Sequence, residues 1–468
     1  MPEQGSTDHS ADYDVVIVGG GGAGLAAAIT ASDEGASVLL VEAADELGGA
    51  TALAGGSFMA AGTPQQRAAG YPDDSPDEFY DYYMTFNRWN ADPAVVRRFC
   101  DAAAPTMAWL EVLGVEFLPE RLYRAGLERS PRSHRPTGAG LAIVQALRAA
   151  CSARNIDVAV GNRVDGLLFD GDRVRGVRAR GEEVTARSVI VTTGGFGSNS
   201  DMVKAYYPDA NRGGDDVWSP APATCVGDGI AMAEAAGAGT TGINHGELLL
   251  SSGFSHDLEP FVPGWLVYVT AGGRRFVNEL APHTVITPLA LTHGDSCWVI
   301  LDEEARRSAV ADRNSQFGAG SWVAETILAQ VSQGRVRTAG TVAELGSVAG
   351  IDPVALTATV ERYNADCAAG LDSQFFKDPA AMKPIATPPF YAVELRPSVV
   401  AVTGYGLRVD PDARVLGASD GRPISGLYAA GEVCGSVLGA QYVGGGNAVG
   451  SAIIFGRIAG RTAVTDVR

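Results

Sequence analysis

The chain has few cysteines, and no two of them are spaced to act together. Its 468 residues include Cys100, Cys151, Cys225, Cys297, Cys367 and Cys434, and no C-x-x-C pair occurs among them. This distribution argues against a metal site and against a disulfide framework. Scattered single cysteines are compatible with a reducing compartment, and we expect a cytoplasmic protein.

The sequence also lacks an uninterrupted apolar segment long enough to cross a bilayer. Residues 15–32 and 433–456 are uncharged, but glycine runs break both, and the second contains Gln441 and Asn447. Neither stretch has the pattern of a membrane helix, so no integral membrane segment is expected. The first twelve residues are polar and acidic, without the basic start and apolar centre of a signal peptide.

Positive charge is scarce relative to negative charge. The chain has 36 Lys and Arg against 54 Asp and Glu, a formal net charge of −18, and the acids are spread along its whole length. Such a field repels nucleic acid phosphates and anionic lipid, so neither is an expected partner.

Glycine, in contrast, is abundant. The 59 glycines fall in clusters beside apolar strand-like runs, which indicates close approach of the backbone to a ligand. The chain length suggests two or three domains, or one large discontinuous domain with an insertion.

The N-terminal region has a strand–turn–helix–strand pattern. The run DVVIV at 14–18 predicts a buried parallel strand, and GGGGAG, a helical segment and the strand SVLLVE follow it. Gly19, Gly21 and Gly24 have G-x-G-x-x-G spacing, and Glu42 follows about 18 residues later. The three glycines allow a tight turn, approach of a pyrophosphate and packing of helix on sheet, while Glu42 can bind a ribose diol. The pattern predicts dinucleotide binding.

Two further strand-like runs end in glycine turns. They are RSVIVTTGGFGSN at 187–199 and GLYAAGEVCG at 426–435, the second of which contains Glu432. Three such turns directed at one ligand suit a long dinucleotide lying along a sheet, and they exceed what NAD needs. The alternative is that the additional turns belong to a Rossmann-like sheet without contacting a ligand.

Several phrases resemble one family, the FAD proteins that include fumarate reductases and 3-ketosteroid dehydrogenases. They are ELGGATALAGG (46–56), SHRPTGAG (133–140), GDGIAMAEAAGA (227–238), RRFVNE (274–279) and GGNAVGSAIIFGRIAGR (445–461). They occur in the family's order and span nearly the whole chain, so the chain is identified as a member.

The resemblance implies an α/β fold in two parts. A Rossmann-like FAD-binding domain of the glutathione-reductase type is expected from both chain ends, residues 12–240 and 384–468. An inserted α+β substrate or cap domain is expected at residues 241–383, which lack dinucleotide turns and contain amphipathic helical stretches. In such folds the active site lies between the domains.

The resemblance also indicates which residues hold FAD. The loop at residues 50–56 lacks the histidine that binds the flavin covalently in some relatives, so FAD is expected to be non-covalent. The predicted cofactor residues are Gly19, Gly21, Ala23, Gly24, Glu42, Ala43, Gly49, Ala50, Thr51, Gly55, Gly56, Val164, Thr193, Gly194, Gly195, Asp228, Gly431, Glu432, Gly446, Asn447, Ala448 and Val449.

Three positions bear on the substrate. Fumarate reductases hold a carboxylate with arginines and a histidine; the arginine after the RFVNE phrase is here His283, and the arginine before the GGNA turn is Tyr442. The family's histidine before a T-x-G-G turn is also missing from VVAVTGYG. A dicarboxylate is disfavoured without these cations. The resemblance instead favours a steroid-like ketone.

The regiochemistry is left open. Tyr442 matches the second tyrosine of 3-ketosteroid dehydrogenases, whereas His283 replaces the first. The segment at 62–84 resembles the Δ4 branch, but YVGGG has the tyrosine-to-glycine spacing of the Δ1 branch. The sequence is therefore compatible with both Δ4 and Δ1 dehydrogenation.

The expected chemistry removes a proton beside a ketone and transfers a hydride to flavin N5. A phenol and a backbone N–H can stabilise the carbonyl oxygen as it gains charge, and a neutral imidazole can accept the proton. We expect Tyr442 with the Gly446 amide to polarise the ketone and His283 to accept the proton, although the roles of the two side chains can be exchanged. The alternatives are a packing role for Tyr442 and a solvated loop position for His283.

The same constellation run in reverse gives an enone reductase. A second hypothesis is a reductase of another α,β-unsaturated small molecule, and a third is a flavoprotein that only relays electrons. The third is disfavoured because the sequence has no haem C-x-x-C-H motif and no iron–sulfur cysteine run. The electron acceptor or donor is not identified by the sequence.

Overall fold

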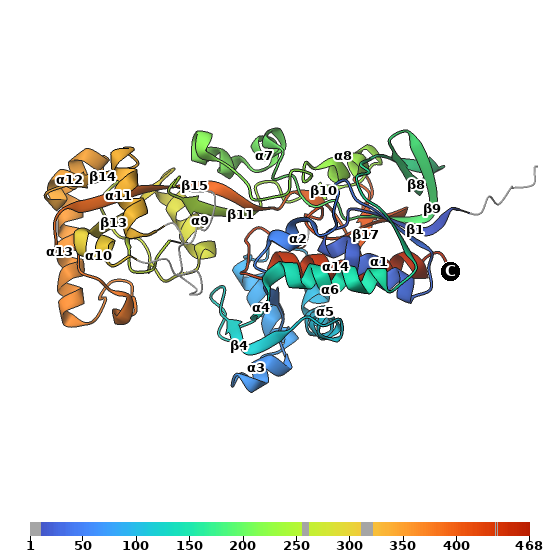
Figure 1. Ribbon diagram of the computed structural model, residues 1–468, viewed down its shortest axis with the longest axis horizontal. Helices are drawn as coiled ribbons and strands as arrows, with labels where there is room; N and C mark the ends of the chain where they lie inside the picture. The colour runs from blue at the N-terminus through green and yellow to red at the C-terminus, as the bar shows by residue number, and fades with distance from the viewer. Residues whose placement is uncertain (1–10, 255–261, 310–321, 436, 438) are drawn as a thin grey trace, which may run out of the picture. The chain divides into compact units, whose positions relative to one another are not determined.

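The computed structural model describes residues 11–254, 262–309, 322–435, 437 and 439–468 (Figure 1). The chain folds into two compact units. The terminal unit comprises the chain up to Tyr207, Ala221–Gly246 and Val402–Arg468, and the inserted unit comprises Pro208–Pro220 and Glu247–Ala401.

A parallel sheet forms the centre of the terminal unit. Its strands follow the order β18-β9-β1-β2-β6, and each neighbouring pair is parallel. Val16 of β1 lies opposite Leu39 on one side and Val189 on the other. These apolar runs are buried, as expected for a sheet covered on both faces. The strands are β1 (Tyr13–Val18), β2 (Val38–Val41), β6 (Ile156–Ala159), β9 (Glu182–Val191) and β18 (Pro423–Ala429), with antiparallel additions β17 (Arg414–Leu416), β8 (Arg173–Ala179) and β7 (Val164–Asp170).

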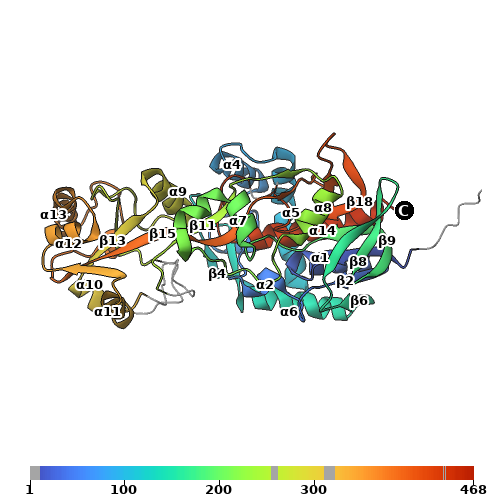
Figure 2. The same ribbon diagram turned by 90° about the horizontal axis from the view of Figure 1, so that it is seen from above.

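Two helices, α1 (Gly22–Asp33) and α14 (Asn447–Thr465), pack against this sheet, and α6 (Ala139–Ser152) lies beside α1 (Figures 1 and 2). Gly456 of α14 sits on α1 so closely that a Cβ atom there would overlap the carbonyl oxygen of Ala23. Glycine therefore sets the distance between these two helices. None of the described helices is long and apolar enough to cross a membrane.

The rest of the terminal unit consists of further helices, of which α5 is long, and two small sheets. The segment from α4 to α5 packs through the rings of Phe79, Tyr83 and Phe99. Ser75 and Asp92 cap α4 and α5 by accepting backbone N–H groups of the first turn. The elements are α2 (Gly49–Leu53), α3 (Pro64–Ala68), α4 (Pro76–Phe86), α5 (Pro93–Val112), α7 (Ser200–Tyr206), α8 (Asp228–Ala235), β3 (Phe58–Met59), β4 (Phe117–Tyr123), β5 (Ser133–Pro136), β10 (Thr240–Thr241) and β16 (Gly406–Leu407).

The inserted unit has its own sheet, with the order β11-β15-β13-β12 and with β14 also paired to β15. Alternate residues of β13 enter two hydrophobic clusters, Val299 on one face and Trp298 on the other. The strands are β11 (Gly246–Ser251), β12 (Val267–Val269), β13 (Cys297–Asp302), β14 (Val336–Ala339) and β15 (Phe390–Thr403), and the helices are α9 (His283–His293), α10 (Glu303–Arg307), α11 (Ala324–Ser332), α12 (Val342–Ala349) and α13 (Pro353–Ala369).

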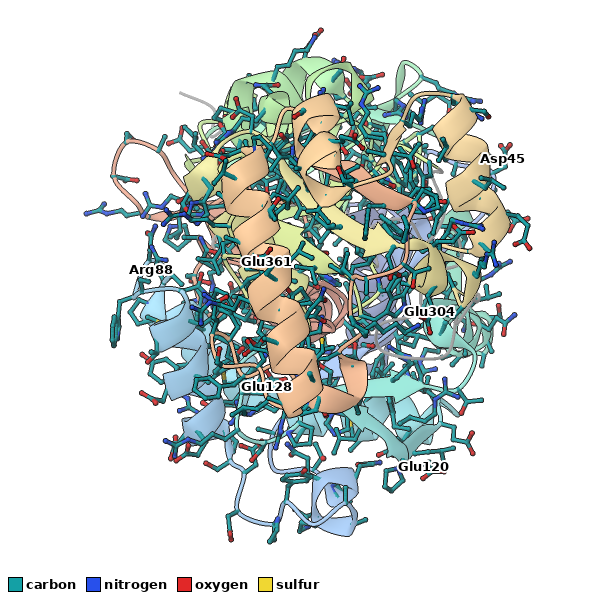
Figure 3. All side chains as sticks on the ribbon, turned by 90° about the vertical axis from the view of Figure 1, so that its left-hand side faces the viewer. Asp45, Arg88, Glu120, Glu128, Glu304 and Glu361 are labelled. Carbon is teal, nitrogen blue, oxygen red and sulfur yellow. The ribbon has the colours of Figure 1, made fainter. Side chains whose placement is uncertain are left out.

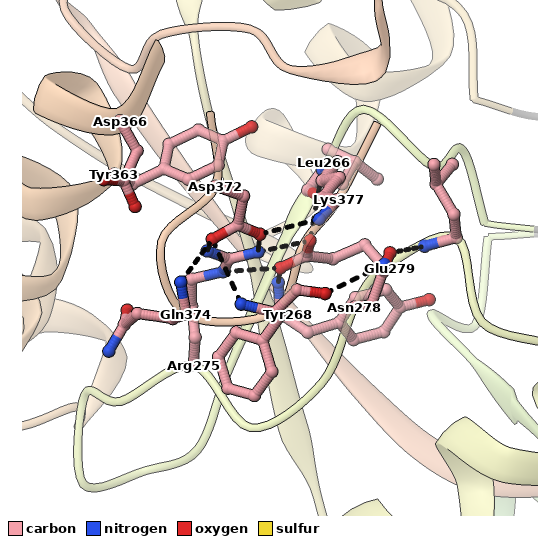
Figure 4. Close-up of polar contacts among 12 residues, drawn as sticks. Leu266, Tyr268, Arg275, Asn278, Glu279, Tyr363, Asp366, Asp372, Gln374 and Lys377 are labelled. Carbon is pink, nitrogen blue, oxygen red and sulfur yellow. Dashed lines mark hydrogen bonds and ion pairs between the residues drawn. The ribbon is translucent and has the colours of Figure 1, made fainter. Parts of the chain in front are cut away.

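Four charged side chains form a buried network inside the inserted unit (Figure 4). Arg275 Nη2 lies 2.8 Å from Glu279 Oε2 and 2.8 Å from Asp372 Oδ2, and Lys377 Nζ lies 3.2 Å from Glu279 Oε2. All four are essentially inaccessible to solvent. Burial opposes ionisation of Asp372, but the hydrogen bonds from Arg275 outweigh it and lower the pKa of Asp372 to about 2. The network joins the RRFVNE segment to the loop after α13.

The boundaries of the two units differ from the expected ones. We expected residues 384–468 to form the second part of the FAD-binding domain, but residues 384–401 belong to the inserted unit, because β15 pairs with β13 and β14. Residues 208–220 join them through the bridge between Trp218 and Val399. Residues 241–246, expected in the cap, belong to the terminal unit.

Candidate functional site

The predicted nucleotide turns meet at one edge of the parallel sheet. Gly19 follows β1, Glu42 follows β2, Thr193 comes two residues after β9, and Gly431 comes two residues after β18. Because these strands are parallel, their carboxyl ends share an edge, the usual ligand-binding edge of such sheets.

The first turn requires glycine for steric reasons. Gly19 has a φ of +107°, and a Cβ atom at Gly24 would overlap the carbonyl oxygen of Gly19. No side chain caps the N-terminus of α1 at Gly21, so the backbone N–H groups of its first turn can face an anion. Gly49 lies against this turn, where its Cβ atom would stand 3.1 Å from the Gly21 Cα. This cradle suits a pyrophosphate.

Glu42 is held in place by backbone amides. Its Oε2 accepts a hydrogen bond from Gly20 N at 2.6 Å, and its Oε1 accepts one from Ala44 N at 2.7 Å. Each carboxylate oxygen keeps a further acceptor site, so the oriented group can still bind ribose hydroxyls.

The second and third turns are joined to each other. Glu432 Oε1 accepts hydrogen bonds from Thr403 N at 2.8 Å and from Thr403 Oγ1 at 2.7 Å. Burial raises the pKa of Glu432. A side chain at Gly195 would overlap Thr403 Oγ1. Thr193 Oγ1 is buried without a hydrogen-bond partner in the described part of the chain, a feature of a site that awaits a polar ligand.

The remaining predicted cofactor positions lie on the same elements or close to them in the chain. The Asp228 carboxylate, at the start of α8, forms an ion pair with Arg163. Gly194 has a φ of +78° and Gly56 one of +73°. The other positions are Ala23 in α1, Ala43 after β2, Ala50 and Thr51 in α2, Gly55 after α2, and Val164 at the start of β7.

Tyr442 lies at the N-terminus of α14. Gly446 is the residue before the first turn, with a φ of +102°, and its Cβ atom would stand 2.9 Å from Met59 N. The Tyr442 hydroxyl accepts a hydrogen bond from Ala448 N at 3.3 Å. Among the described residues, none accepts a hydrogen bond from the Gly446 amide. A phenol and an available backbone N–H therefore lie beside the positive end of a helix.

His283 is the first residue of α9 and not part of a loop. Burial lowers the pKa of His283 to about 4, and the helix N-terminus also disfavours a positive charge there. The imidazole is therefore neutral at pH 7. Thr284 Oγ1 and Thr287 Oγ1 on the same helix are buried without hydrogen-bond partners among the described residues. His283 belongs to the inserted unit and Tyr442 to the terminal unit.

Two further polar residues, Glu247 and Tyr123, are not among the site residues predicted from the sequence. Glu247 lies in β11, where burial raises its pKa to about 8, and the only signal was an acid at the start of an apolar run. The Tyr123 hydroxyl bonds to Ser57 Oγ at 2.9 Å, and a Cβ atom at Gly445 would stand 2.7 Å from it. Nothing in the local sequence indicated that Tyr123 lies beside the C-terminal glycine run.

The described residues contain no group of three or more His, Cys, Asp and Glu side chains placed to hold a metal ion. The six cysteines are free, and five of them are buried.

A family model described as FAD binding domain matches residues 14–449. The chain belongs to this family, and its cofactor is FAD. The edge described above fits that group: a glycine cradle for the pyrophosphate, an oriented acid for the ribose and an unpartnered hydroxyl at Thr193.

Named relatives agree with this assignment. The chain is 34% identical over 482 residues to NADH:fumarate oxidoreductase of Klebsiella pneumoniae (strain 342), of which it spans about half (100% of this chain, 49% of that protein). It is 33% identical to a fumarate reductase (cytochrome) of Shewanella frigidimarina, covering 96% of this chain and 76% of that protein. The crystal structure of 3-ketosteroid-Δ4-(5α)-dehydrogenase from Rhodococcus jostii RHA1 superposes with a TM-score of 0.79 at 29% identity over 99% of both chains.

The fold is therefore that of flavoprotein reductases and dehydrogenases, as predicted. The chain is an FAD-dependent oxidoreductase, and its named relatives are fumarate reductases and a 3-ketosteroid dehydrogenase.

Proposed function

We propose that this enzyme introduces or reduces a C=C bond beside the ketone of a steroid-like cyclic substrate. The observation that carries the proposal is the bond from Ala448 N to the Tyr442 hydroxyl, which places the phenol at the start of α14, where Gly446 is the N-cap residue. Two neutral donors suit a carbonyl oxygen that gains negative charge, whereas a carboxylate requires cations.

The phenol is oriented for this role. Its oxygen accepts the Ala448 N–H at 3.3 Å, which fixes the phenol beside the first turn of α14. The positive end of the α14 dipole further stabilises negative charge on the bound oxygen.

The neutral His283 imidazole accepts the proton from the carbon beside the ketone. Its low pKa keeps it unprotonated at pH 7 and therefore able to accept a proton. When bound, the flavin accepts or supplies the hydride. The direction of turnover is then set by the electron partner and not by these two side chains. The exchanged assignment, with Tyr442 as the proton acceptor, is the alternative.

The Rhodococcus dehydrogenase supports a steroid ketone as substrate, since its structure is described in complex with 4-androstene-3,17-dione and covers the chain from end to end. The second candidate is reduction of an unsaturated carboxylate, supported by the relatives named as fumarate reductases. The residues at 283 and 442 argue against it, because neither is a cation at pH 7.

Anaerobic titration of the holoenzyme tests the proposal. A saturated 3-ketosteroid should bleach the oxidised flavin, and a steroid enone should reoxidise the reduced flavin, while fumarate should do neither. An unchanged spectrum with both steroids, or reoxidation by fumarate alone, would refute the ketone assignment.

Two variants test the residues. Tyr442→Phe should lower the rate of flavin reduction about 10²- to 10³-fold, as loss of an oxyanion donor does, while FAD stays bound. His283→Ala should lower it about 10²- to 10⁴-fold. Full turnover by both variants would refute the roles assigned to Tyr442 and His283. The substrate class would then still be tested by the anaerobic titration.

A further inference from the structure

We propose that α4 and the residue after it position Tyr442 for catalysis; this inference rests on the proposed role of Tyr442. The segment that carries Tyr442 is far from α4 in the sequence, yet side chains of α4 hold it at several points. Tyr82, Tyr83 and Asn87 supply these contacts, and we call them the α4 clamp.

Two bonds of the α4 clamp lie on either side of Tyr442. Asn87 Oδ1 accepts a hydrogen bond from Gln441 N at 2.8 Å. The Tyr82 hydroxyl donates to the carbonyl oxygen of Val443 at 3.0 Å. The residue before Tyr442 and the residue after it are thus both fixed by side chains only five positions apart.

The third member ties this segment to α14. The Tyr83 hydroxyl donates to Val437 O and accepts a hydrogen bond from Asn447 Nδ2 at 3.1 Å. Asn447 is the first residue of α14 and is fully buried. The same helix therefore places the backbone of Tyr442 and the helix end that its hydroxyl contacts.

The α4 clamp is built to be rigid. Burial raises the pKa values of Tyr82 and Tyr83, so both phenols remain protonated donors. Asn87 is buried, whereas its neighbour Arg88 is exposed (Figure 3). A side chain at Gly439 would overlap Asn87 Oδ1, so glycine there lets the Asn87 amide reach the segment. Loops held in this way do not reorient freely.

Placement matters because the Tyr442 hydroxyl works by geometry. A displacement of about 1 Å at a reacting group can cost about 10²-fold in rate. Removing one clamp bond should shift Tyr442 without removing any group that touches the substrate, so Tyr82, Tyr83 and Asn87 are positioning residues.

Tyr82→Phe is the sharpest perturbation. It deletes one oxygen and keeps the ring, which packs on Phe86 and lies under Arg132. Tyr80→Phe is the matched control, because Tyr80 lies on the same helix under Arg97 and its hydroxyl makes no hydrogen bond to a described residue. With holoenzyme, the rate of flavin reduction by a saturated 3-ketosteroid should fall about tenfold for Tyr82→Phe, as expected for a partial displacement. Tyr80→Phe should stay at the wild-type rate, and substrate affinity and FAD content should hold in both.

A double-mutant cycle with Tyr442→Phe separates positioning from general destabilisation. If Tyr82 acts through Tyr442, Tyr82→Phe should add no further loss in the Tyr442→Phe background. Independent, multiplicative losses, or a wild-type rate for Tyr82→Phe, would overturn the inference while leaving the proposed function intact. A wild-type rate for Tyr442→Phe itself would instead refute the proposed role of Tyr442, and the inference with it. If Tyr82→Phe fails to accumulate with FAD, Asn87→Ser takes its place in the same cycle.

Discussion

Asp372→Asn should severely destabilise the inserted unit. Asp372 accepts hydrogen bonds from Arg275 Nη1 at 3.0 Å and Nη2 at 2.8 Å, and also from backbone amides of the following residues. Asparagine has nearly the same shape, but it replaces one carboxylate oxygen by an NH₂ group that faces other donors. The substitution leaves Glu279 as the one carboxylate against two buried cations, Arg275 and Lys377.

The magnitude follows from burial. Removing one partner of a fully buried ion pair typically costs about 3–5 kcal/mol, because the remaining charge stays out of water. The same interaction has a pH signature. The pKa of Asp372 falls from 3.8 to about 2 on folding, a difference that corresponds to about 2 kcal/mol. Because the folded pKa is the lower one, this stability is present above about pH 4 and is lost as the pH falls towards 2.

Urea unfolding of the holoenzyme, followed by tryptophan fluorescence, measures both effects. Asp366→Asn is the matched control, since Asp366 is also buried in this unit, but among the described residues its carboxylate bonds only to the Ser373 amide and hydroxyl. It should cost about 1 kcal/mol, because both bonds go to Oδ2 and the amide oxygen of asparagine can accept them in its place. The reasoning fails if Asp372→Asn costs no more than Asp366→Asn, or if the stability of Asp372→Asn falls between pH 4 and 2 as steeply as that of the wild type.

Three further outcomes follow from the packing and charges. Gly456→Ala should lower the free energy of unfolding by about 1–3 kcal/mol, because its methyl group overlaps Ala23 O; an unchanged melting temperature contradicts this. Glu247→Gln should abolish a loss of thermal stability that the wild type shows as the pH rises from about 4.5 to about 8, since burial raises the pKa of Glu247 and stability is greatest where the carboxyl is protonated in both states; parallel pH profiles of the two proteins would refute it. Glu42→Gln should weaken FAD binding about tenfold, because its amide NH₂ faces the backbone N–H of either Gly20 or Ala44; equal flavin retention on dilution would count against the role of Glu42.

The nucleotide edge could be predicted because its signals are local. The turn after β1 needs glycine at 19 and 24 for reasons that concern only the adjoining strand and helix, so spacing alone identifies it. The acid at 42 lies at the end of the next strand, and a strand of four residues brings it back to Gly20. Short-range steric requirements of this kind can be predicted from the sequence alone.

The parts that were not predicted depend on distant partners. The network residues Arg275 and Asp372 are 97 positions apart, and no local sequence pattern in either segment predicts their contact. Most of β15 groups with the inserted unit, and its pairing with β13 crosses about 90 residues of chain whose return path no local pattern reveals. The raised pKa of Glu247 likewise arises from surroundings that only tertiary packing supplies.

The α4 clamp follows from what a tyrosine can do at position 442. An arginine at that position has a flexible stem and five donors, so it can adjust to a carboxylate over a range of backbone positions. A phenol has one donor on a rigid ring, so its hydroxyl reaches a given point only if the backbone places it there. Bonds at Gln441 and Val443 supply that placement from one helix. Exchanging a cation for a phenol thus shifts the requirement for accuracy from the side chain to the segment that carries it.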